Sequence, residues 1–269
     1  MSDGSVSSPA VPYKTLVGGR VFLKYACLEY PWLVHGTVVF KGRGFESPDS
    51  AWRGHVADFG RQYVHPAPRK IVIPAQVHGS RVIQVNSGGE AVEAPTCDGL
   101  VTANGGVMIG VNTADCVPLL AVGDGARVVG AAHCGWRGIA AGVVESFLKE
   151  VRAAVGVGSP EGSGGIRDVR FVIGASVGPC CYEVGDDFLS AFSGREVEEC
   201  AETRGGKTVF DLRRLVRLRL LDEGIDRAAV FTDNTCTSCA GDSLCSYRAG
   251  GNTCGRMYTF AMIMSEEAG

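Results

Sequence analysis

A cysteine and a histidine lie at the ends of two short apolar segments that a tight turn can join. Cys116 precedes the apolar run 117–122, and His133 ends the run 127–133. The link between the runs contains Asp124-Gly125, and Asp-Gly is the preferred pair at the centre of a two-residue hairpin turn. With that pair at the centre, Cys116 stands directly opposite His133, and their Cβ atoms are about 4.5–5.5 Å apart.

A thiol and an imidazole at this separation have two chemical uses. They can bind one zinc ion together, or the imidazole can hold the thiol as a nucleophilic thiolate. A buried cysteine beside an ordinary core histidine is the third interpretation, and the spacing alone does not decide among them. The polar segment 113–115 and the glycine-containing segment 134–138 favour a site, because they place both residues at strand ends that face loops.

The residues after His133 predict a turn from a strand into a helix. Apolar side chains recur at helical spacing from Ile139 to Val155, so we expect an amphipathic helix over 138–155. A helix start with free backbone N–H groups, close to the charge of Arg137, is a good place to bind an anion such as phosphate. The alternative, that glycines at 135 and 138 serve only to allow the tight turn, stays open.

The other elements alternate between strands and helices, with hairpins among them. Helices are expected near 186–193 and over 211–223, the latter capped by Asp211, and 42–66 reads as a long loop. Strands are expected at 33–41, 70–77, 81–85, 107–112, 169–173, 229–232 and 256–264. The pattern predicts an α/β (α+β) fold, in which mixed β-sheets flanked by helices form a layered sandwich. We expect residues 1–15 to be a loose leader and 16–269 to form a single domain.

Composition narrows the classes of function. The net charge of −3 and the pI near 6.0 give no reason to expect a nucleic-acid partner. No run of eighteen apolar residues occurs, so no membrane span is expected, and the absence of an export signal predicts a cytoplasmic protein. The oligomeric state is not predictable from the sequence.

The 11 cysteines are therefore expected to be thiols and metal ligands rather than a disulfide framework. Four of them raise the question of a second metal site, although free thiols are the favoured interpretation of their spacing: Cys236, Cys239, Cys245 and Cys254.

Several short motifs occur in a fixed order between residues 35 and 264. They are QVHG at 76–79, DGLVT at 98–102, TADCVP at 113–118, HCGWRG at 133–138, GPCCYEVG at 178–185 and SYR at 246–248. This set resembles the signature of the laccase-domain purine nucleoside phosphorylases, a group also labelled multicopper polyphenol oxidase. The resemblance implies a single α/β domain of mixed sheets with helices outside.

The resemblance also implies a metal site. The histidine of QVHG, the cysteine of TADC and the histidine of HCGWRG correspond to His78, Cys116 and His133. Three ligands with one open position are typical of catalytic zinc, so Zn²⁺ is the expected cofactor and copper is not expected. The three residues are then catalytic as well as metal-binding, and Asp115, next to Cys116, is a fourth catalytic candidate.

The activities implied by the resemblance are those of a purine nucleoside enzyme. They are phosphorolysis of adenosine, inosine, guanosine and methylthioadenosine to the base and a (methylthio)ribose 1-phosphate, and deamination of adenosine to inosine. The expected partners are small-molecule nucleosides and phosphate. The residues expected to bind substrate or phosphate are Arg43, Gln76, Arg137 and Arg248.

Three other functions compete with this one. Cys116 and His133 could be the nucleophile and base of a cysteine-dependent amide hydrolase or transferase, in which His78 would have no role. A binding module with structural zinc is disfavoured by the open fourth position. A multicopper oxidase needs a type 1 centre and a further histidine-rich cluster, which the 5 histidines of the chain cannot supply.

Overall fold

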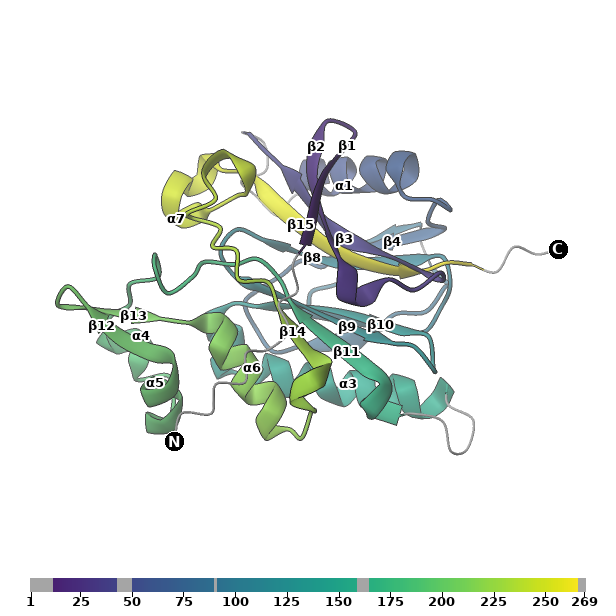
Figure 1. Ribbon diagram of the computed structural model, residues 1–269. Coiled ribbons are helices and arrows are strands. Elements are labelled where there is room, and N and C mark those ends of the chain that lie inside the picture. The colour runs from purple at the N-terminus through teal and green to yellow at the C-terminus, as the bar shows by residue number, and fades with distance from the viewer. Residues whose placement is uncertain (1–11, 43–49, 90, 159–164, 266–269) are drawn as a thin grey trace.

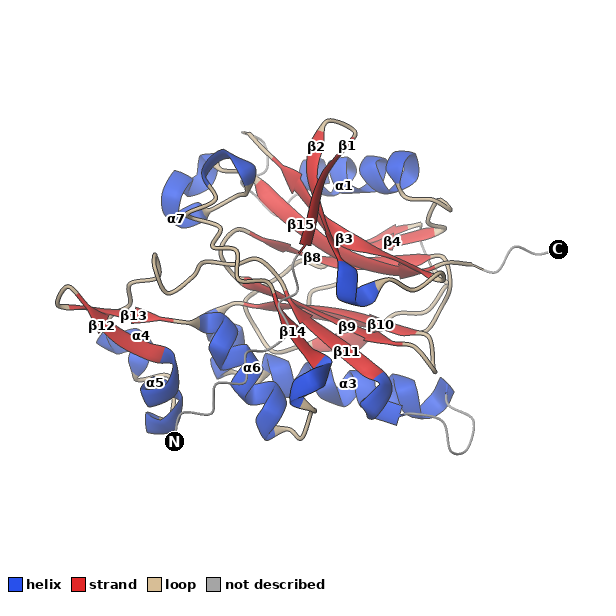
Figure 2. Cartoon of the chain, viewed as in Figure 1, coloured by secondary structure: helices blue, strands red, loops and turns tan. Residues whose placement is uncertain are grey.

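The computed structural model describes residues 12–42, 50–89, 91–158 and 165–265, and two β-sheets stacked on each other dominate it (Figures 1 and 2). The first sheet has seven strands among these residues and mixes parallel with antiparallel pairs. In spatial order they are β1 (Pro12–Val17), β2 (Arg20–Tyr25), β3 (Leu33–Phe40), β15 (Arg256–Ile263), β8 (Val107–Thr113), β4 (Lys70–Val72) and β6 (Val92–Glu93).

The second sheet is also mixed and has six strands in the described part of the chain. In spatial order they are β14 (Val230–Thr232), β11 (Val169–Ile173), β9 (Val117–Gly123), β10 (Val128–Cys134), β7 (Gly99–Thr102) and β5 (Val82–Gln84). A separate ribbon pairs β12 (Ala201–Arg204) with β13 (Lys207–Phe210). The predicted layered fold of mixed sheets flanked by helices is confirmed.

Helices cover the outer faces of both sheets (Figure 1). The α-helices are α1 (Ser50–Tyr63), α2 (Trp136–Ala140), α3 (Val143–Gly158), α4 (Asp186–Leu189), α5 (Gly194–Cys200), α6 (Leu212–Asp222) and α7 (Tyr247–Gly250). The short 3-10 helices are η1 (Ala26–Leu28), η2 (Gly165–Asp168), η3 (Arg227–Ala229), η4 (Gly241–Ser243) and η5 (Gly251–Thr253). Helix α1 lies on the first sheet, whereas α3 and α6 lie on the second. Within the described ranges, no helix combines the length and the hydropathy that a bilayer crossing requires.

The burial pattern of the central strands explains the layers. Along β9, Leu119 and Ala121 pack against α3 and α6, whereas Leu120 and Val122 pack between the two sheets. Successive side chains of a strand point to opposite faces, so a strand that is apolar at every position is buried on both sides. Helices must therefore cover the outer face, and the short apolar runs 117–122 and 127–133 encode this arrangement.

The expected loop over 42–66 is wrong for residues 50–63, which form α1. Trp52, Val56 and Phe59 recur at helical spacing and are buried against the first sheet. The surrounding polar and glycine residues masked this periodicity in the sequence. Close packing against the sheet favours glycine at position 60, since a Cβ there would lie 2.9 Å from the Cε of Met108.

Two other boundaries differ from the expected ones. Residues 12–15 of the expected leader belong to β1, which pairs along its whole length with β2, so the boundary at residue 15 falls inside a strand. The helix expected over 138–155 is divided into α2 and α3 by Gly142, which has φ +89°. That conformation interrupts a right-handed helix and favours glycine. By contrast, Asp211 caps α6 as expected, accepting hydrogen bonds from the N–H groups of the next turn.

The predicted register of the β9–β10 hairpin is wrong by two residues. His133 lies opposite Pro118 rather than opposite Cys116, and Val128 lies opposite Gly123. The connection therefore contains the four residues 124–127 instead of two. Within it, the N–H of Arg127 donates to the carbonyl of Asp124, and Arg127 has φ +45°. A turn followed by a left-handed residue is the usual solution for longer hairpin loops.

Candidate metal centre

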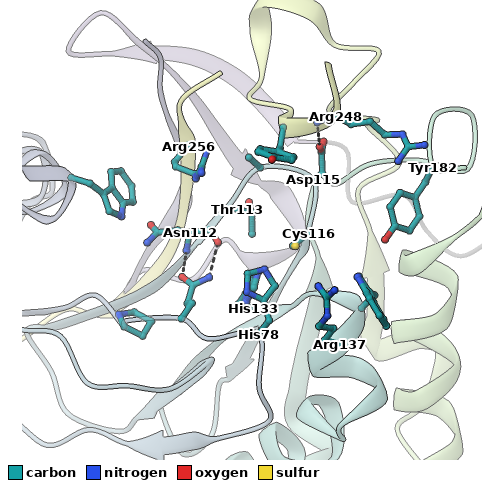
Figure 3. Close-up of a pocket in the computed structure, with 16 residues that line it drawn as sticks. His78, Asn112, Thr113, Asp115, Cys116, His133, Arg137, Tyr182, Arg248 and Arg256 are labelled. Carbon is teal, nitrogen blue, oxygen red and sulfur yellow. Dashed lines mark hydrogen bonds between the residues drawn. The ribbon is translucent and has the colours of Figure 1, made fainter. Parts of the chain in front are cut away.

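Three donor side chains meet where the two sheets and α2 come together (Figure 3). The ligand atoms of His78, Cys116 and His133 all lie within 4.8 Å of one another. The two imidazole rings are 4.8 Å apart between centroids and nearly perpendicular, at 85°. His78 comes from the loop between β4 and β5, Cys116 immediately precedes β9, and His133 is near the end of β10. The structure therefore brings together all three residues of the predicted metal site.

The carboxylate of Asp98 holds both histidines from behind. Asp98 is fully buried, and its Oδ1 accepts hydrogen bonds from Nδ1 of His133 and from the backbone N–H of His78, each at 2.9 Å. Its Oδ2 accepts from the N–H groups of Gly79 at 2.8 Å and Val77 at 3.2 Å. A carboxylate behind a ligating imidazole fixes the tautomer, so the Nε2 of His133 is left to face the cavity.

Asp98 also explains the backbone at His78, which has φ +58°. That left-handed conformation is unusual for a residue with a side chain, and the hydrogen bonds from 77–79 to one carboxylate stabilise it here. Asp98 was not among the residues predicted for the site. Asp98 is the first residue of the DGLVT motif, but the sequence does not indicate that it contacts His78 and His133.

The charges of these groups reinforce one another. Burial alone would raise the pKa of the Cys116 thiol, yet the neighbouring His133, helped by a hydrogen bond from His78, lowers it to about 6. Burial would lower the pKa of His133, whereas Cys116 and Asp98 raise it to about 9. For Asp98, burial acts to raise the pKa, but the hydrogen bonds from His133 and the backbone outweigh it and lower the pKa. Cys116 thus favours the thiolate, which is the form that binds metals and attacks electrophiles.

Two glycines allow the close approach of the three ligands. A Cβ on Gly135 would lie 3.0 Å from Cδ2 of His78 and 3.3 Å from Sγ of Cys116. A Cβ on Gly138 would lie 2.8 Å from the carbonyl oxygen of Gly79. Because the turn of His78 packs directly against the start of α2, the HCGWRG segment needs glycine at both places. The glycines are thus needed for this packing rather than only for the turn into the helix, since Gly135 has an ordinary φ of −73°.

The three ligands open into a cavity of about 660 Å³. Drug-sized and cofactor-sized ligands occupy pockets of about 300–1,000 Å³. Aromatic rings and arginines from distant parts of the chain share its wall, as Figure 3 shows. The lining residues beyond the three ligands include Trp52, Gln76, Asn112, Thr113, Asp115, Trp136, Arg137, Tyr182, Tyr247, Arg248 and Arg256.

Asp115 lines the cavity, but its carboxylate is engaged in the surrounding loops. Oδ1 accepts from the hydroxyl of Thr237 at 2.6 Å, and Oδ2 accepts from the backbone N–H of Arg248 at 2.7 Å. The residue has φ +90°, so these bonds also hold an uncommon backbone conformation next to Cys116. This arrangement fits a positioning role, and the expected acid–base role stays a prediction.

Of the residues expected to bind substrate, three line the cavity and one lies outside the described residues, namely Arg43. Arg137 stacks on the ring of Trp136, with 4.3 Å between its Cζ and the ring centroid. Arg248 donates through Nη2 to the carbonyl of Glu183 at 3.0 Å. The side-chain amide of Gln76 makes two hydrogen bonds to the backbone of Asn112, so it ties the loop of His78 to β8.

Tyr182 and Arg256 are among the polar groups of the cavity that sequence reasoning missed. Tyr182 belongs to the GPCCYEVG motif, and both residues are far from Cys116 along the chain. Arg248 lies over the ring of Tyr182, 5.6 Å from its centroid. Arg256 begins β15 and donates to the carbonyl of Gly255. Only the folded sheets show that these residues share a pocket with the three ligands.

Stacked mixed sheets with an open His-Cys-His donor set define a class of α/β proteins with a pocket that can hold a metal ion. The chain belongs to the family described as multi-copper polyphenol oxidoreductase laccase, whose family model matches residues 55–264. The resemblance drawn from the motifs is thereby confirmed.

Relatives and a solved structure support the same assignment. The chain is 33% identical over 198 residues to the purine nucleoside phosphorylase YlmD of Geobacillus stearothermophilus, covering 69% of each chain. It is 30% identical over 200 residues to the adenosine deaminase RL5 of an unknown prokaryotic organism, covering 70% of this chain and 73% of that one. The crystal structure of YlmD from G. stearothermophilus superposes with a TM-score of 0.78 at 26% identity, covering 96% of this chain and 100% of that one.

Proposed function

We propose that this protein is a zinc-dependent purine nucleoside enzyme that catalyses phosphorolysis and the deamination of adenosine. One observation carries the proposal: the donors of His78, Cys116 and His133 converge at one end of a cavity of about 660 Å³. Closed structural zinc sites use four protein ligands, whereas catalytic sites use three and leave a position for water or substrate.

The donor set fits zinc better than copper. Two imidazoles and one thiolate suit both metals, but a blue-copper site is enclosed and usually carries a weak axial methionine. His78 is instead exposed, and no methionine lines the described part of the cavity. When bound, zinc would supply a Lewis acid that activates water and polarises the substrate. Asp98 would keep the Nε2 of His133 directed toward the metal.

The cavity wall suits a purine nucleoside and an anion. The rings of Trp136, Tyr182 and Tyr247 offer flat apolar faces for a purine base. Guanidinium groups at Arg137 and Arg248 offer paired donors of the kind that bind phosphate oxygens. Phosphorolysis needs this anion position and deamination does not, since water is the second substrate there. The names of the relatives YlmD and RL5 support the two activities.

A second candidate, a cysteine-dependent amide hydrolase or transferase, has an observation in its favour. Cys116, His133 and Asp98 are arranged as nucleophile, base and orienting carboxylate, and the pKa of Cys116 is lowered to about 6. Against it stands His78, a second imidazole beside the same thiol with no task in that mechanism. The metal site uses all three side chains, so we favour it.

The test is product analysis with matched variants. Wild-type protein, His78→Ala and Cys116→Ala are incubated with adenosine and phosphate, and zinc content is measured on the same samples. The proposal predicts adenine with ribose 1-phosphate, together with inosine, from the wild type only, and zinc loss in both variants. An amide-cleaving activity that needs Cys116 but survives His78→Ala would establish the hydrolase instead. A folded wild type without nucleoside turnover would refute the proposal.

A further inference from the structure

We propose that four cysteines outside the catalytic pocket form a second zinc site with a structural task. The Sγ atoms of Cys180, Cys181, Cys236 and Cys239 all lie within 4.8 Å of one another. We call this group the cysteine cluster. It joins two loops that are far apart along the chain, one after β11 and one after β14.

The distances fit one shared ion better than a disulfide. The Sγ of Cys239 is 3.5 Å from that of Cys180 and 3.4 Å from that of Cys181, whereas a disulfide bond measures about 2.05 Å. Zinc–sulfur bonds of about 2.3 Å in a tetrahedron place the sulfurs about 3.8 Å apart. Cys239 is equally close to two thiols, so small movements would seat all four around one ion.

The local chain has the features of a thiolate ligand loop. Cys236 and Cys239 have the C-x2-C spacing that recurs in structural zinc sites. The backbone N–H of Gly178, in the other loop, donates to the Sγ of Cys236 at 3.2 Å. Hydrogen bonds of this kind orient a ligating thiolate and stabilise its charge. Each loop thus supplies two thiols and Gly178 links the pairs directly.

A buried positive charge lies beside the cysteine cluster. A Cβ built on Gly178 would lie 2.8 Å from Nη2 of Arg213 and 3.3 Å from Sγ of Cys180, so the guanidinium and the thiols share this glycine. Arg213 is only 6% exposed, and it bonds to the carbonyls of Asp233 and Thr235 just before Cys236. Four thiolates around a divalent ion leave net negative charge, which a neighbouring buried arginine offsets.

The set differs from the one that the sequence suggested. Cys245 and Cys254, the other members of the 236–254 spacing, do not join Cys236 and Cys239. Cys245 is buried with its Sγ near the carbonyl of Phe40, and Cys254 contacts Arg256. Cys180 and Cys181 take their places in the folded chain.

The position of the cysteine cluster gives it a task. Tyr182 follows Cys181 directly and lines the catalytic cavity, and Thr237 follows Cys236 and donates its hydroxyl to Asp115. An ion bound to the four thiols would clamp the two loops together. It would thereby hold Tyr182 at the wall of the cavity and Thr237 against the carboxylate of Asp115. The assigned role is therefore positioning, through a zinc ion that does not contact the substrate.

The test counts zinc in the full-length chain purified under reducing conditions. We expect Cys239→Ser to contain one zinc per chain fewer than the wild type, and Cys254→Ser, the matched control, to contain the wild-type amount. The same loss is expected when Cys239→Ser is placed in a Cys116→Ala background. This second comparison does not depend on a metal at the catalytic pocket, so the failure of either site can be recognised separately.

A spectroscopic measurement keeps the proposal testable if Cys239→Ser does not fold. Cobalt is exchanged for zinc in Cys116→Ala, which retains the cysteine cluster but has no thiol among the pocket ligands. We expect the strong thiolate-to-cobalt charge-transfer absorption of a tetrahedral four-sulfur site. Its absence, unchanged zinc in folded Cys239→Ser, a disulfide from Cys239 to Cys180 or Cys181 under reducing conditions, or iron in place of zinc would overturn the assignment.

Discussion

Two groups of metal-type ligands lie close together in this molecule, and their surroundings are opposite. The pocket group mixes two imidazoles with the thiol of Cys116, has the buried carboxylate of Asp98 behind it, and opens into a cavity. The cysteine cluster contains only thiols, includes the exposed Cys180 and Cys239, and does not contribute to the lining of the described cavity.

The number of ligands, and the groups that hold them in place, distinguish a site suited to catalysis from a site suited to structural support. Three ligands beside a cavity leave space for a substrate, whereas four thiols close the coordination sphere of one ion. In the pocket group, the carboxylate of Asp98 orients the ring of His133 and accepts from the backbone of His78. In the cysteine cluster, a backbone N–H donates to Cys236, and a buried guanidinium lies beside the same glycine. The first arrangement suits chemistry and the second suits holding loops together.

The largest expected effect separates the two groups by activity. Cys116→Ala should reduce nucleoside turnover to the level of a control without enzyme, because it removes a ligand from the pocket. Cys239→Ser should lower turnover much less, because it only loosens the placement of Tyr182 and Thr237. It should also unfold earlier, with Tm falling by about 2–4 °C for each kcal/mol of lost stability. Steady-state kinetics and calorimetry on both variants provide the measurement. Equal loss of turnover in the two would remove the distinction.

Asp98→Asn should weaken the pocket alone. Losing the carboxylate behind a ligating histidine typically costs about 10–100-fold in metal affinity, and here the same carboxylate also holds the turn of His78. Zinc affinity is measured by competition with a chelator. Cobalt absorption in a Cys116→Ala background reports on the cysteine cluster and should not change. Asp124→Asn is the control. Asp124 lies between β9 and β10 and accepts a hydrogen bond from the indole N–H of Trp32, away from the three candidate ligands. An equal fall in zinc affinity in Asp98→Asn and Asp124→Asn would contradict the role of Asp98.

Within the pocket, Arg137→Gln should divide the two reactions. A hydrogen bond to a charged group contributes about 1.5 kcal/mol, which corresponds to roughly tenfold, so the KM for phosphate should rise about that much in phosphorolysis. Deamination should fall less because no phosphate takes part. Arg167→Gln, an exposed arginine in η2, serves as the control. The same loss in both reactions would assign Arg137 to the nucleoside rather than to phosphate.

The smallest effects come from two matched glycine variants. Gly135→Ala adds a methyl group against His78 and Cys116, and Gly178→Ala adds one against Cys180 and Arg213. Gly135 has φ −73°, which any residue adopts, so contact alone decides the result there. We expect each variant to weaken metal binding only at its own site, by about 1 kcal/mol or roughly fivefold. Gly156→Ala, with open space around it, should change neither. If either variant also weakened metal binding at the other site, the pocket group and the cysteine cluster would not be independent.

The sequence predicts the layered fold because apolar runs and turn residues are local signals. Such signals place β8 to β11 and the capped helix α6 correctly. They fail where a short polar stretch hides helical spacing, as in α1, and where a hairpin loop is longer than its Asp-Gly pair suggests. Register depends on the full loop geometry, so a two-residue error arises from one misjudged turn.

The sequence predicts which three candidate ligands come together, but not the groups that support them. His78, Cys116 and His133 each stand in a distinctive motif, and all three meet in the structure. Asp98 and Cys180 stand in motifs too, but their partners are non-local, and periodicity carries no information about which loops meet. Pairing of the sheets decides that the loop of Cys180 faces the loop of Cys239.

The four hydrogen bonds to Asp98 lower the entropy cost of binding a metal ion in the pocket. Ordering flexible side chains around an ion costs conformational entropy at the moment of binding. In this protein the rotation of His133 and the turn of His78 are already restrained by one buried carboxylate. That entropy is lost during folding instead, so the site is preorganised. Removing metal from the pocket should therefore leave a folded receptor, unlike small domains whose folding requires the ion.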